Sequence, residues 1–302
     1  MDPLALLDAL AAGPVTPAAL AAAHSVPEAA LAPAIDALRA EGLLAPPGPV
    51  LAPGDLGAAM GPLTLAWRCR RPVTFLAETD STNRVARAAA AAWPGPPTPG
   101  PLVVADHQTA GRGRLGRTWA APPGQDLLFS LVLRPAIPAA EAPRAVLVWA
   151  AAMAEALGVF VKWPNDLVDA AGHKLGGVLA ELELAPGPTP TIAHIVLGVG
   201  VNVNTTDFPG LPGATSLARL RGARVDRAST LAALVAAIEA APLTAADPLA
   251  PWRARSFTLG RRVRVNGREG LATGLRDDGA LLVDGAPVLT GDVELLAPEP
   301  AA

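Results

Sequence analysis

Between residues 73 and 245, short apolar runs alternate with longer segments of helical pattern, and this alternation limits the fold more than any other feature. Short apolar runs bounded by turn residues are typical of strands. We expect strands at 73–78, 102–106, 127–134, 159–163, 177–184 and 192–201, and helices at 81–92, 141–157 and 229–240. The turn at 185–190 is typical of a hairpin and argues against a purely parallel sheet. The sequence therefore predicts an α/β (α+β) domain with a mixed sheet over residues 73–248.

The first 58 residues predict a winged helix-turn-helix domain. Helices are expected at 3–12, at 17–23 behind Thr16 as N-cap, and from a Ser25–Glu28 capping box to Glu41, with Gly42 as C-cap. Residues 43–53 could form two short strands around a turn, and residues 59–72 are expected to be a linker. Such a domain can bind DNA through its third helix. One basic residue against six acidic ones in residues 1–60 disfavours DNA binding.

Residues 252–298 predict a second small module. Five short β segments are separated by turn signals at Asn266-Gly267, Asp278-Gly279 and Asp284-Gly285. This pattern is typical of a small SH3-like β-barrel.

Composition favours a soluble cytoplasmic protein. The single cysteine, Cys69, excludes an internal disulfide framework and fits a reducing compartment. The N-terminus has no basic region of the kind that begins a signal peptide. The most apolar window, 145–161, is short for a membrane span and carries Glu155. No membrane contact is expected, and the net charge of −3 gives no reason to expect nucleic-acid binding overall.

Two stretches of the central domain combine glycine or hydroxyl groups with charge. Ser81 and Thr82 begin a predicted helix, where exposed N–H groups can hold a polar ligand; simple helix capping is the alternative. Residues 111–119 alternate three glycines with three arginines and end at Trp119. Glycine lets the backbone approach a ligand, and arginine offers a fork to carboxylate or phosphate. We expect a flexible loop that folds over an anionic ligand; a solvated basic loop or an arginine-rich nucleic-acid contact is the alternative.

The third stretch contains both lysines of the chain, Lys162 and Lys174. A strand ends at residue 163, residues 164–166 turn, and the next strand begins near Lys174. Asn165 and Asp166 therefore lie at a strand end, where binding sites commonly form. One carboxylate there could take Mg²⁺ with substrate phosphates. Asn202 and Asn204 lie at another strand end.

In this order, "DSTN", "QTAGRGRLGRTW", "KWPND", "HKLGGVLAEL" and "GVGVNVN" resemble the biotin–protein ligases of the bifunctional layout. The resemblance covers residues 73–245. It implies a mixed-sheet fold of the class II aminoacyl-tRNA synthetase/biotin ligase type. It also implies synthesis of biotinyl-5′-AMP from biotin and ATP with Mg²⁺, followed by transfer of biotin to a lysine of the biotin carboxyl carrier protein of acetyl-CoA carboxylase. Relatives often form homodimers through the central sheet.

The resemblance also implies roles for individual residues. Biotin would be bound by Ser81, Thr82, Asn83, Gln108, Arg112, Gly113, Arg114, Lys174, Gly176 and Gly177. ATP would be bound by Arg114, Arg117, Trp119, Asn165, Asp166, Lys174 and Asn202, with Asp166 as the Mg²⁺ ligand. Lys174, Arg112 and Arg114 would be catalytic, because cations must offset the repulsion between a carboxylate and a triphosphate.

Three questions stay open at this point. Lys162 could meet phosphate, an acidic acceptor surface or a structural carboxylate. A lipoate–protein ligase is the nearest alternative enzyme, although the arginine–glycine loop and the flanking modules favour biotin. A biotin-responsive transcriptional repressor is the alternative from another class, and the acidic first sixty residues weaken it.

Overall fold

The computed structural model describes residues 1–54 and 60–296. These residues form two compact units, the first made of Met1–Phe75 with Asp226–Ala232 and the second of Leu76–Val225 with the chain from Ala233 onward. Among them, no single helix has the length and apolar character needed to cross a membrane. Pro17–Ala23 and Glu28–Ala40, a pair bent by 95°, meet those two criteria only when they are counted together.

The first unit is mainly helical. Its segments are α1 (Pro3–Ala11), α2 (Pro17–Ala23), η1 (Glu28–Leu31), α3 (Ala32–Ala40) and α4 (Pro62–Cys69). As expected, the Thr16 side chain accepts the Ala19 N–H and Pro17 follows it in the first turn of α2. Two antiparallel bridges replace the expected pair of strands, one between Val15 and Leu51 and one between Leu44 and Pro53. Buried leucines from α1, α2, η1 and α3 form its core.

The predicted capping box at the start of the third helix is wrong. Ser25 has a positive φ of 53°, and the N-cap of η1 is Pro27, which makes no side-chain capping bond. The α-helix starts only at Ala32, with Pro33 in its first turn. Proline is accepted there because its missing N–H would have had no intrahelical partner. Pro33 therefore sets the start of α3 and leaves a 3₁₀ turn before it.

The segment predicted to be a linker, residues 59–72, contains helix α4. The Glu41 carboxylate accepts the Leu63 N–H in the first turn of this helix, at 3.0 and 3.2 Å from its two oxygens. Thr64 and Leu65 are buried. The Gly61-Pro62 start suggested a loop, whereas proline is also a common first residue of a helix. Residue 59 of the predicted linker, and residues 55–58 at the end of the predicted first domain, lie outside the described residues.

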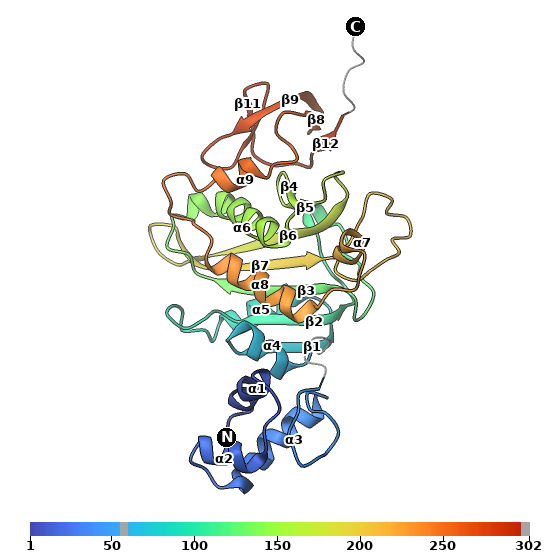
Figure 1. Cartoon of the computed structure of the whole chain (residues 1–302). Coiled ribbons are helices and arrows are strands. Elements are labelled where there is room, and N and C mark those ends of the chain that lie inside the picture. Colours follow the sequence, from blue (N-terminus) through green and yellow to red (C-terminus); the bar gives the residue numbers. More distant parts are fainter. Residues whose placement is uncertain (55–59, 297–302) are drawn as a thin grey trace. The chain divides into compact units, whose positions relative to one another are not determined.

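The second unit is built on a seven-stranded mixed sheet with the order β1-β2-β3-β7-β6-β5-β4 (Figure 1). Its strands are β1 (Val73–Thr79), β2 (Leu102–Gln108), β3 (Leu127–Leu133), β4 (Phe160–Lys162), β5 (Asp166–Val168), β6 (Lys174–Ala185) and β7 (Thr191–Val201). The six predicted strands are confirmed. Strand β5 was not predicted, because residues 164–166 were interpreted as a turn and β5, which begins at Asp166, is only three residues long. It pairs antiparallel with both β4 and β6.

The helical segments after β1 are α5 (Thr82–Ala90), η2 (Arg114–Gly116), η3 (Ala139–Glu141), α6 (Ala142–Leu157), α7 (Leu217–Arg221), α8 (Arg227–Glu239) and α9 (Ala250–Ala254). Two of them, α5 and α6, pack on the sheet. Helix α5 packs on β2, β3 and β7, where Ala86 and Ala90 meet Val103, Val132 and Val196. Helix α6 packs on β4, β5 and β6 (Figure 1) and buries Trp149 and Met153. The apolar window at 145–161 is thus a core helix followed by a strand.

The last part of the second unit is a five-stranded antiparallel sheet of order β11-β10-β9-β8-β12. Its strands are β8 (Arg262–Val265), β9 (Arg268–Leu275), β10 (Leu281–Val283), β11 (Ala286–Val288) and β12 (Glu294–Leu295). All five predicted β segments are confirmed. Asn266 and Gly267 both have positive φ, at 51° and 78°, which is the geometry that such two-residue hairpin turns require.

Candidate active site

A cavity of about 760 Å³ lies in the second unit and contains nearly all the predicted site residues. Its wall comes from the start of α5, the 111–120 loop, the β4–β5 turn, strands β6 and β7, the 208–214 segment and residues 292–295. Of the predicted residues, Gly176 alone does not line it. A Cβ on Gly176 would lie 2.7 Å from the Gly200 carbonyl oxygen, so this glycine serves strand packing.

Glycines on β6 and β7 form part of the cavity wall and, because they have no side chain, leave the space above the sheet open. Gly177 pairs with Gly200, and Gly198 lies on the same side of β7 two residues earlier. A Cβ on Gly198 would be 2.1 Å from Asn83 Oδ1, and one on Gly200 would be 2.5 Å from Trp119 Cε2. Any larger residue would therefore push Asn83 or Trp119 off the sheet.

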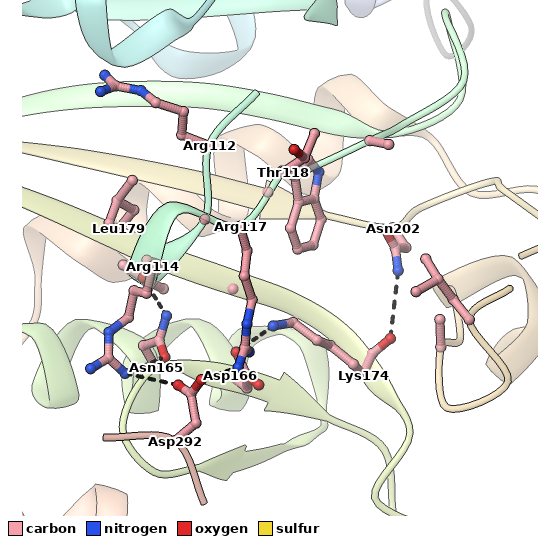
Figure 2. A pocket seen from close by; sticks show the side chains of 18 of the residues that line it. Arg112, Arg114, Arg117, Thr118, Asn165, Asp166, Lys174, Leu179, Asn202 and Asp292 are labelled. Carbon is pink, nitrogen blue, oxygen red and sulfur yellow. Dashed lines mark hydrogen bonds and ion pairs between the residues drawn. The ribbon is translucent and has the colours of Figure 1, made fainter. Parts of the chain in front are cut away.

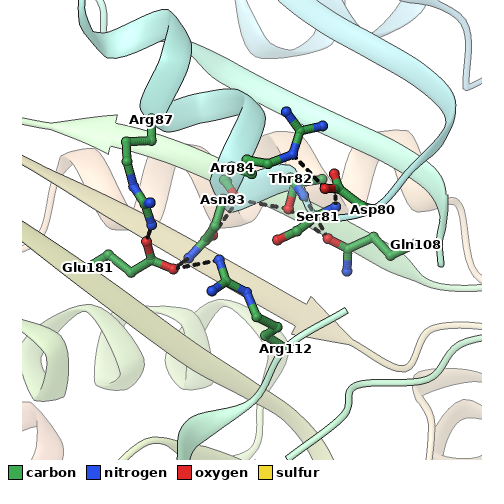
Figure 3. A network of polar contacts seen from close by, with 10 residues as sticks. Asp80, Ser81, Thr82, Asn83, Arg84, Arg87, Gln108, Arg112 and Glu181 are labelled. Atoms are coloured by element: carbon green, nitrogen blue, oxygen red, sulfur yellow. Dashed lines mark hydrogen bonds and ion pairs between the residues drawn. The ribbon is translucent and has the colours of Figure 1, made fainter. Parts of the chain in front are cut away.

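The start of α5 forms a hydrogen-bonded corner of the cavity (Figure 3). Gln108 Oε1 accepts the Thr82 N–H at 2.8 Å, which is the bond that a capping side chain would otherwise make. The same oxygen accepts the Thr82 hydroxyl at 3.1 Å. Ser81 is the N-cap residue but makes no side-chain capping bond. The alternative interpretation of Ser81 as a simple helix cap is therefore wrong. The Ser81 hydroxyl is not used for helix capping and belongs to the cavity wall.

The 111–119 loop is folded by its own backbone. The Trp119 N–H donates to Gly111 O at 2.9 Å, and the Gly113 N–H donates to Arg117 O at 2.7 Å. Leu115 at its tip has a φ of 55°, which is costly for a branched residue. The three arginines consequently emerge from a defined turn, and Arg112, Arg114 and Arg117 all line the cavity (Figure 2).

Lys174 and Asp166 meet inside the cavity. Lys174 Nζ donates to Asp166 Oδ1 at 2.7 Å, and it lies 5.9 Å from the centre of the Trp119 ring (Figure 2). The Trp119 Nε1–H is buried and has no hydrogen-bond partner within the described part of the chain. A buried donor of this kind, beside a cation and a carboxylate, is suited to a polar ligand.

Lys162 lines the same cavity. Burial lowers the pKa of Lys162 below its ordinary value; the negative charge of Asp166 opposes this, and the positive charge of Lys174 adds to it. Lys162 is also the register partner of Asp166 between β4 and β5. The Lys162 ammonium thus belongs to the same part of the cavity wall as Asp166 and Lys174.

Residues beyond position 290 reach the arginines of the loop. Arg114 Nη1 donates to Asn165 Oδ1 at 3.1 Å and lies 3.8 Å from Asp292 Oδ1, while Arg117 forms an ion pair with Asp292 Oδ2 (Figure 2). Five cationic side chains and three carboxylates line the cavity, so its formal charge is +2. An anionic ligand would therefore be attracted.

Asn202 is buried and lies beside Lys174, the first residue of β6. Its Nδ2 donates to Thr215 O at 2.9 Å and lies 3.5 Å from Lys174 O. Asn204 similarly exchanges hydrogen bonds with the backbone of Val225. Asn202 lines the cavity, as predicted, with its amide nitrogen already bonded to the protein.

The sequence interpretation missed three contributors. Glu181 holds side chains of the α5 corner and of the loop. Asp292 comes from the module that was given no site residue. Phe208 and Leu211 lie in an irregular segment that lines the cavity. Glu181 lies on the same strand as "KLGG", four residues after Gly177, so the two-residue period of that strand was the one signal that could have found it.

Comparisons with known proteins show the family of the chain. Residues 76–202 match the Biotin/lipoate A/B protein ligase family. The Biotin--[acetyl-CoA-carboxylase] ligase of Mycobacterium tuberculosis is 35% identical over 242 residues, which cover 71% of this chain and 84% of that protein. The Bifunctional ligase/repressor BirA of Bacillus subtilis is 34% identical over 221 residues, covering 65% of this chain and 66% of that protein.

A solved structure is also similar. The biotin protein ligase from Aquifex aeolicus in complex with biotin and ATP superimposes with a TM-score of 0.61 at 28% identity, over 75% of this chain and 99% of that one. The fold, a mixed sheet that carries the cavity, is therefore that of the biotin/lipoate class of protein ligases. The chain belongs to the Biotin/lipoate A/B protein ligase family, within its biotin–protein ligases.

Proposed function

We propose that this chain is a biotin–protein ligase, which activates biotin with ATP to biotinyl-5′-AMP and transfers biotin to a lysine of a carboxylase carrier domain. The observation that carries the proposal is the convergence of Lys174, Arg114 and Arg117 on one cavity with Asp166 and Trp119. The cavity is large enough for both small molecules, since ligand pockets commonly measure about 300–1,000 Å³.

In the first step, a carboxylate oxygen of biotin attacks the α-phosphorus of ATP. A C–O–P bond forms, the bond from the α-phosphorus to the bridging oxygen breaks, and pyrophosphate leaves. Both reactants are anionic, so catalysis depends on cations placed where they meet. The Lys174 side chain is 40% exposed despite its bond to Asp166, so it can still take a second anionic partner. The arginines of the loop would hold the phosphates.

The cavity fits a Mg²⁺ ion that is bound mainly by the phosphates of ATP. Within residues 1–54 and 60–296, no group of three His, Cys, Asp or Glu side chains could enclose a metal. Asp166 and Asp292 line the cavity, and Mg²⁺ commonly takes one or two carboxylates together with substrate phosphates and water. Asp166 would hold the ion, which neutralises phosphate charge when it is bound.

In the second step, the neutral amine of the acceptor lysine attacks the acyl carbon of biotinyl-5′-AMP. The amide C–N bond forms, the bond to the phosphate oxygen breaks, and AMP leaves with the electron pair. The amine releases its proton to water. The exposed loop above the cavity would exclude water until the acceptor arrives.

The roles of the single residues belong to this proposal. Ser81, Thr82, Asn83, Gln108, Arg112, Gly113 and Gly177 would bind biotin, and Trp119, Asn165 and Asn202 would bind the nucleotide. Their place in the cavity wall supports these assignments. The lipoate–protein ligase alternative is kept as an outcome of the test below.

We propose the same module plan as the sequence suggested: 1–58, 59–72 as connection, 73–248 and 252–298. Helices and antiparallel bridges at the N-terminus support a winged helix-turn-helix, and the five-stranded antiparallel sheet supports an SH3-like module. The acidic charge of the first module disfavours a repressor role for that module. Leu182 and Leu184, exposed on β6, support a homodimer through the central sheet. The single cysteine supports a cytoplasmic location.

The test is incubation with MgATP, a carrier domain and either biotin or lipoate, with the carrier weighed by mass spectrometry. A biotinyl increment on one lysine is expected. A lipoyl increment would instead favour the lipoate–protein ligase. No increment with either acid would overturn ligase activity.

A further inference from the structure

Glu181 does not line the cavity, yet it joins two parts of the cavity wall. It lies on β6, opposite Val196 of β7, and its side chain is 22% exposed. It is the fifth residue after Gly176, beyond the predicted "KLGG" site. Its carboxylate is the common acceptor for one side chain from the helix corner, one from the loop and one from outside the site (Figure 3).

The bonds divide between the two carboxylate oxygens. Oε1 accepts Asn83 Nδ2–H at 3.0 Å and Arg112 Nη2–H at 3.2 Å. Oε2 forms an ion pair with Arg87 of α5. One side chain thus connects α5, the 111–119 loop and β6.

Glu181 fixes which way the Asn83 amide points. Asn83 Oδ1 accepts the Ser130 hydroxyl at 2.6 Å, so its Nδ2 must point to Glu181. Asn83 is only 5% exposed, and water cannot easily replace a lost partner there. An amide donor left without its acceptor would turn toward the cavity and change what the wall offers a ligand.

Glu181 also sets the position of the loop cation. Arg112 and Arg87 are both about half exposed, at 52% and 50%, and both approach the same carboxylate. A single exposed ion pair contributes little. Here the shared acceptor holds two like charges near one another, so its removal would make them repel. Arg112 would then move away from β6 and take its end of the loop with it.

We propose that Glu181 is a positioning residue, which latches Asn83 and Arg112 in the geometry that binds the carboxylic acid substrate and retains its adenylate. The inference rests on the proposed function and deepens it. Glu181 acts through Asn83 and Arg112, both on the cavity wall. Among the described residues, Arg114, Arg117 and Lys174 bond to Asn165, Asp292 and Asp166 and form no hydrogen bond or ion pair with Glu181, so the nucleotide end should be unaffected.

The test uses Glu181→Gln in the full chain, assayed by biotin-dependent pyrophosphate release. Glutamine keeps the shape but loses the charge that holds both arginines. We expect the KM for biotin to rise on the order of tenfold, while kcat and the KM for ATP stay within about twofold. Glu183→Gln is the matched control, since Glu183 is exposed on the same strand outside the cavity and should behave as wild type.

Two further variants separate positioning from a general loss of structure. Arg87→Ala removes one partner outside the cavity and should raise the KM for biotin about threefold. In a double-mutant cycle, Glu181→Gln should raise the KM for biotin by a smaller factor in an Arg112→Ala background than in the wild type, because the bond to Arg112 is already lost there and only the bond to Asn83 remains to be disturbed. Strict additivity in this cycle would overturn the proposal.

The remaining outcomes are also decisive. A Glu181→Gln enzyme with an unchanged KM for biotin, or with equal rises in both KM values, would overturn the latch. If Glu181→Gln does not fold, the Arg87→Ala result decides. A wild-type protein that releases no pyrophosphate with biotin would refute the proposed function instead, which distinguishes the two failures.

Discussion

Lys174 Nζ lies 2.7 Å from Asp166 Oδ1, so a cation and a carboxylate of the cavity wall are paired with each other. The pair joins β6 to β5, and Asp166 is the register partner of Gly177 between those strands. A compact ammonium can share its three N–H groups between Asp166 and a second anion. A planar guanidinium would occupy the space that the second anion needs.

Lys174→Arg should therefore slow adenylate formation by at least about 100-fold, the usual effect of losing one charge-stabilising donor. Pyrophosphate release with saturating biotin and ATP measures it. Arg221→Lys, at the end of α7 outside the cavity, is the control. Release at the wild-type rate in Lys174→Arg would falsify the role given to the ammonium.

Arg114→Gly should let biotinyl-5′-AMP escape. Arg114 Nη1 donates to Asn165 Oδ1 and lies 3.4 Å from Gly291 O, so the substitution releases the loop from two other segments. We expect adenylate release on the order of tenfold faster. Biotin appearing on bystander proteins in a mixed reaction measures it, and strict labelling of the carrier alone would contradict the prediction.

Asp292→Asn should tighten ATP binding. The Asp292 carboxylate pairs with Arg117 and lies near Arg114, so it competes with phosphates for these cations. The KM for ATP should fall about threefold, roughly the size of one partly exposed ion pair. Asp277→Asn, exposed in the same module, is the control. An increased KM for ATP would instead indicate that Asp292 holds the arginines in place.

Gly198→Ala should disturb the biotin end of the cavity. The added Cβ would lie 2.1 Å from Asn83 Oδ1, so Asn83 must move. We expect the KM for biotin to rise at least about tenfold. Gly274→Ala is the control, because its Cβ would meet only Leu282 Cδ1, at 3.6 Å. Wild-type kinetics for Gly198→Ala would mean that Asn83 has no part in binding.

Lys162→Met should stabilise the fold in a pH-dependent way. Burial lowers the pKa of Lys162 below its ordinary value of 10.5, so its charged form costs stability in the native state. This cost is fully present below the lowered pKa and disappears as the pH rises through it toward 10.5. The gain in free energy of unfolding, measured in urea, should therefore be larger at pH 7 than at pH 10. An equal gain at both would mean that packing alone is responsible.

Much of the fold followed from local pattern. The six central strands and five β segments were predicted because apolar runs and Asn-Gly or Asp-Gly turns act over few residues. Strand β5 was missed because three residues give no period, and α4 because Gly61-Pro62 suggests a loop as readily as a helix start.

Only some of the cavity residues were predicted from the sequence. Thr82 and Gln108 share hydrogen bonds across 26 positions of sequence, and their motifs pointed to one site. Asp292 lies 178 positions from Arg114, in a module whose spacing carries no site signal. Such a contact follows from tertiary packing alone. Gly176 was predicted to bind biotin together with Gly177, because sequence alone does not distinguish two adjacent glycines of one motif. Of these two, Gly177 lines the cavity and Gly176 does not.

The ion pair between Arg117 and Asp292 has a consequence for synthesis of the chain on the ribosome. Translation delivers the arginine loop long before residue 292. During that interval, the nascent sheet presents the basic loop without the carboxylate that later opposes it. Only the emergence of the last module completes the charge pattern of the cavity, so a ribosome stalled before that point would carry a basic loop that lacks Asp292.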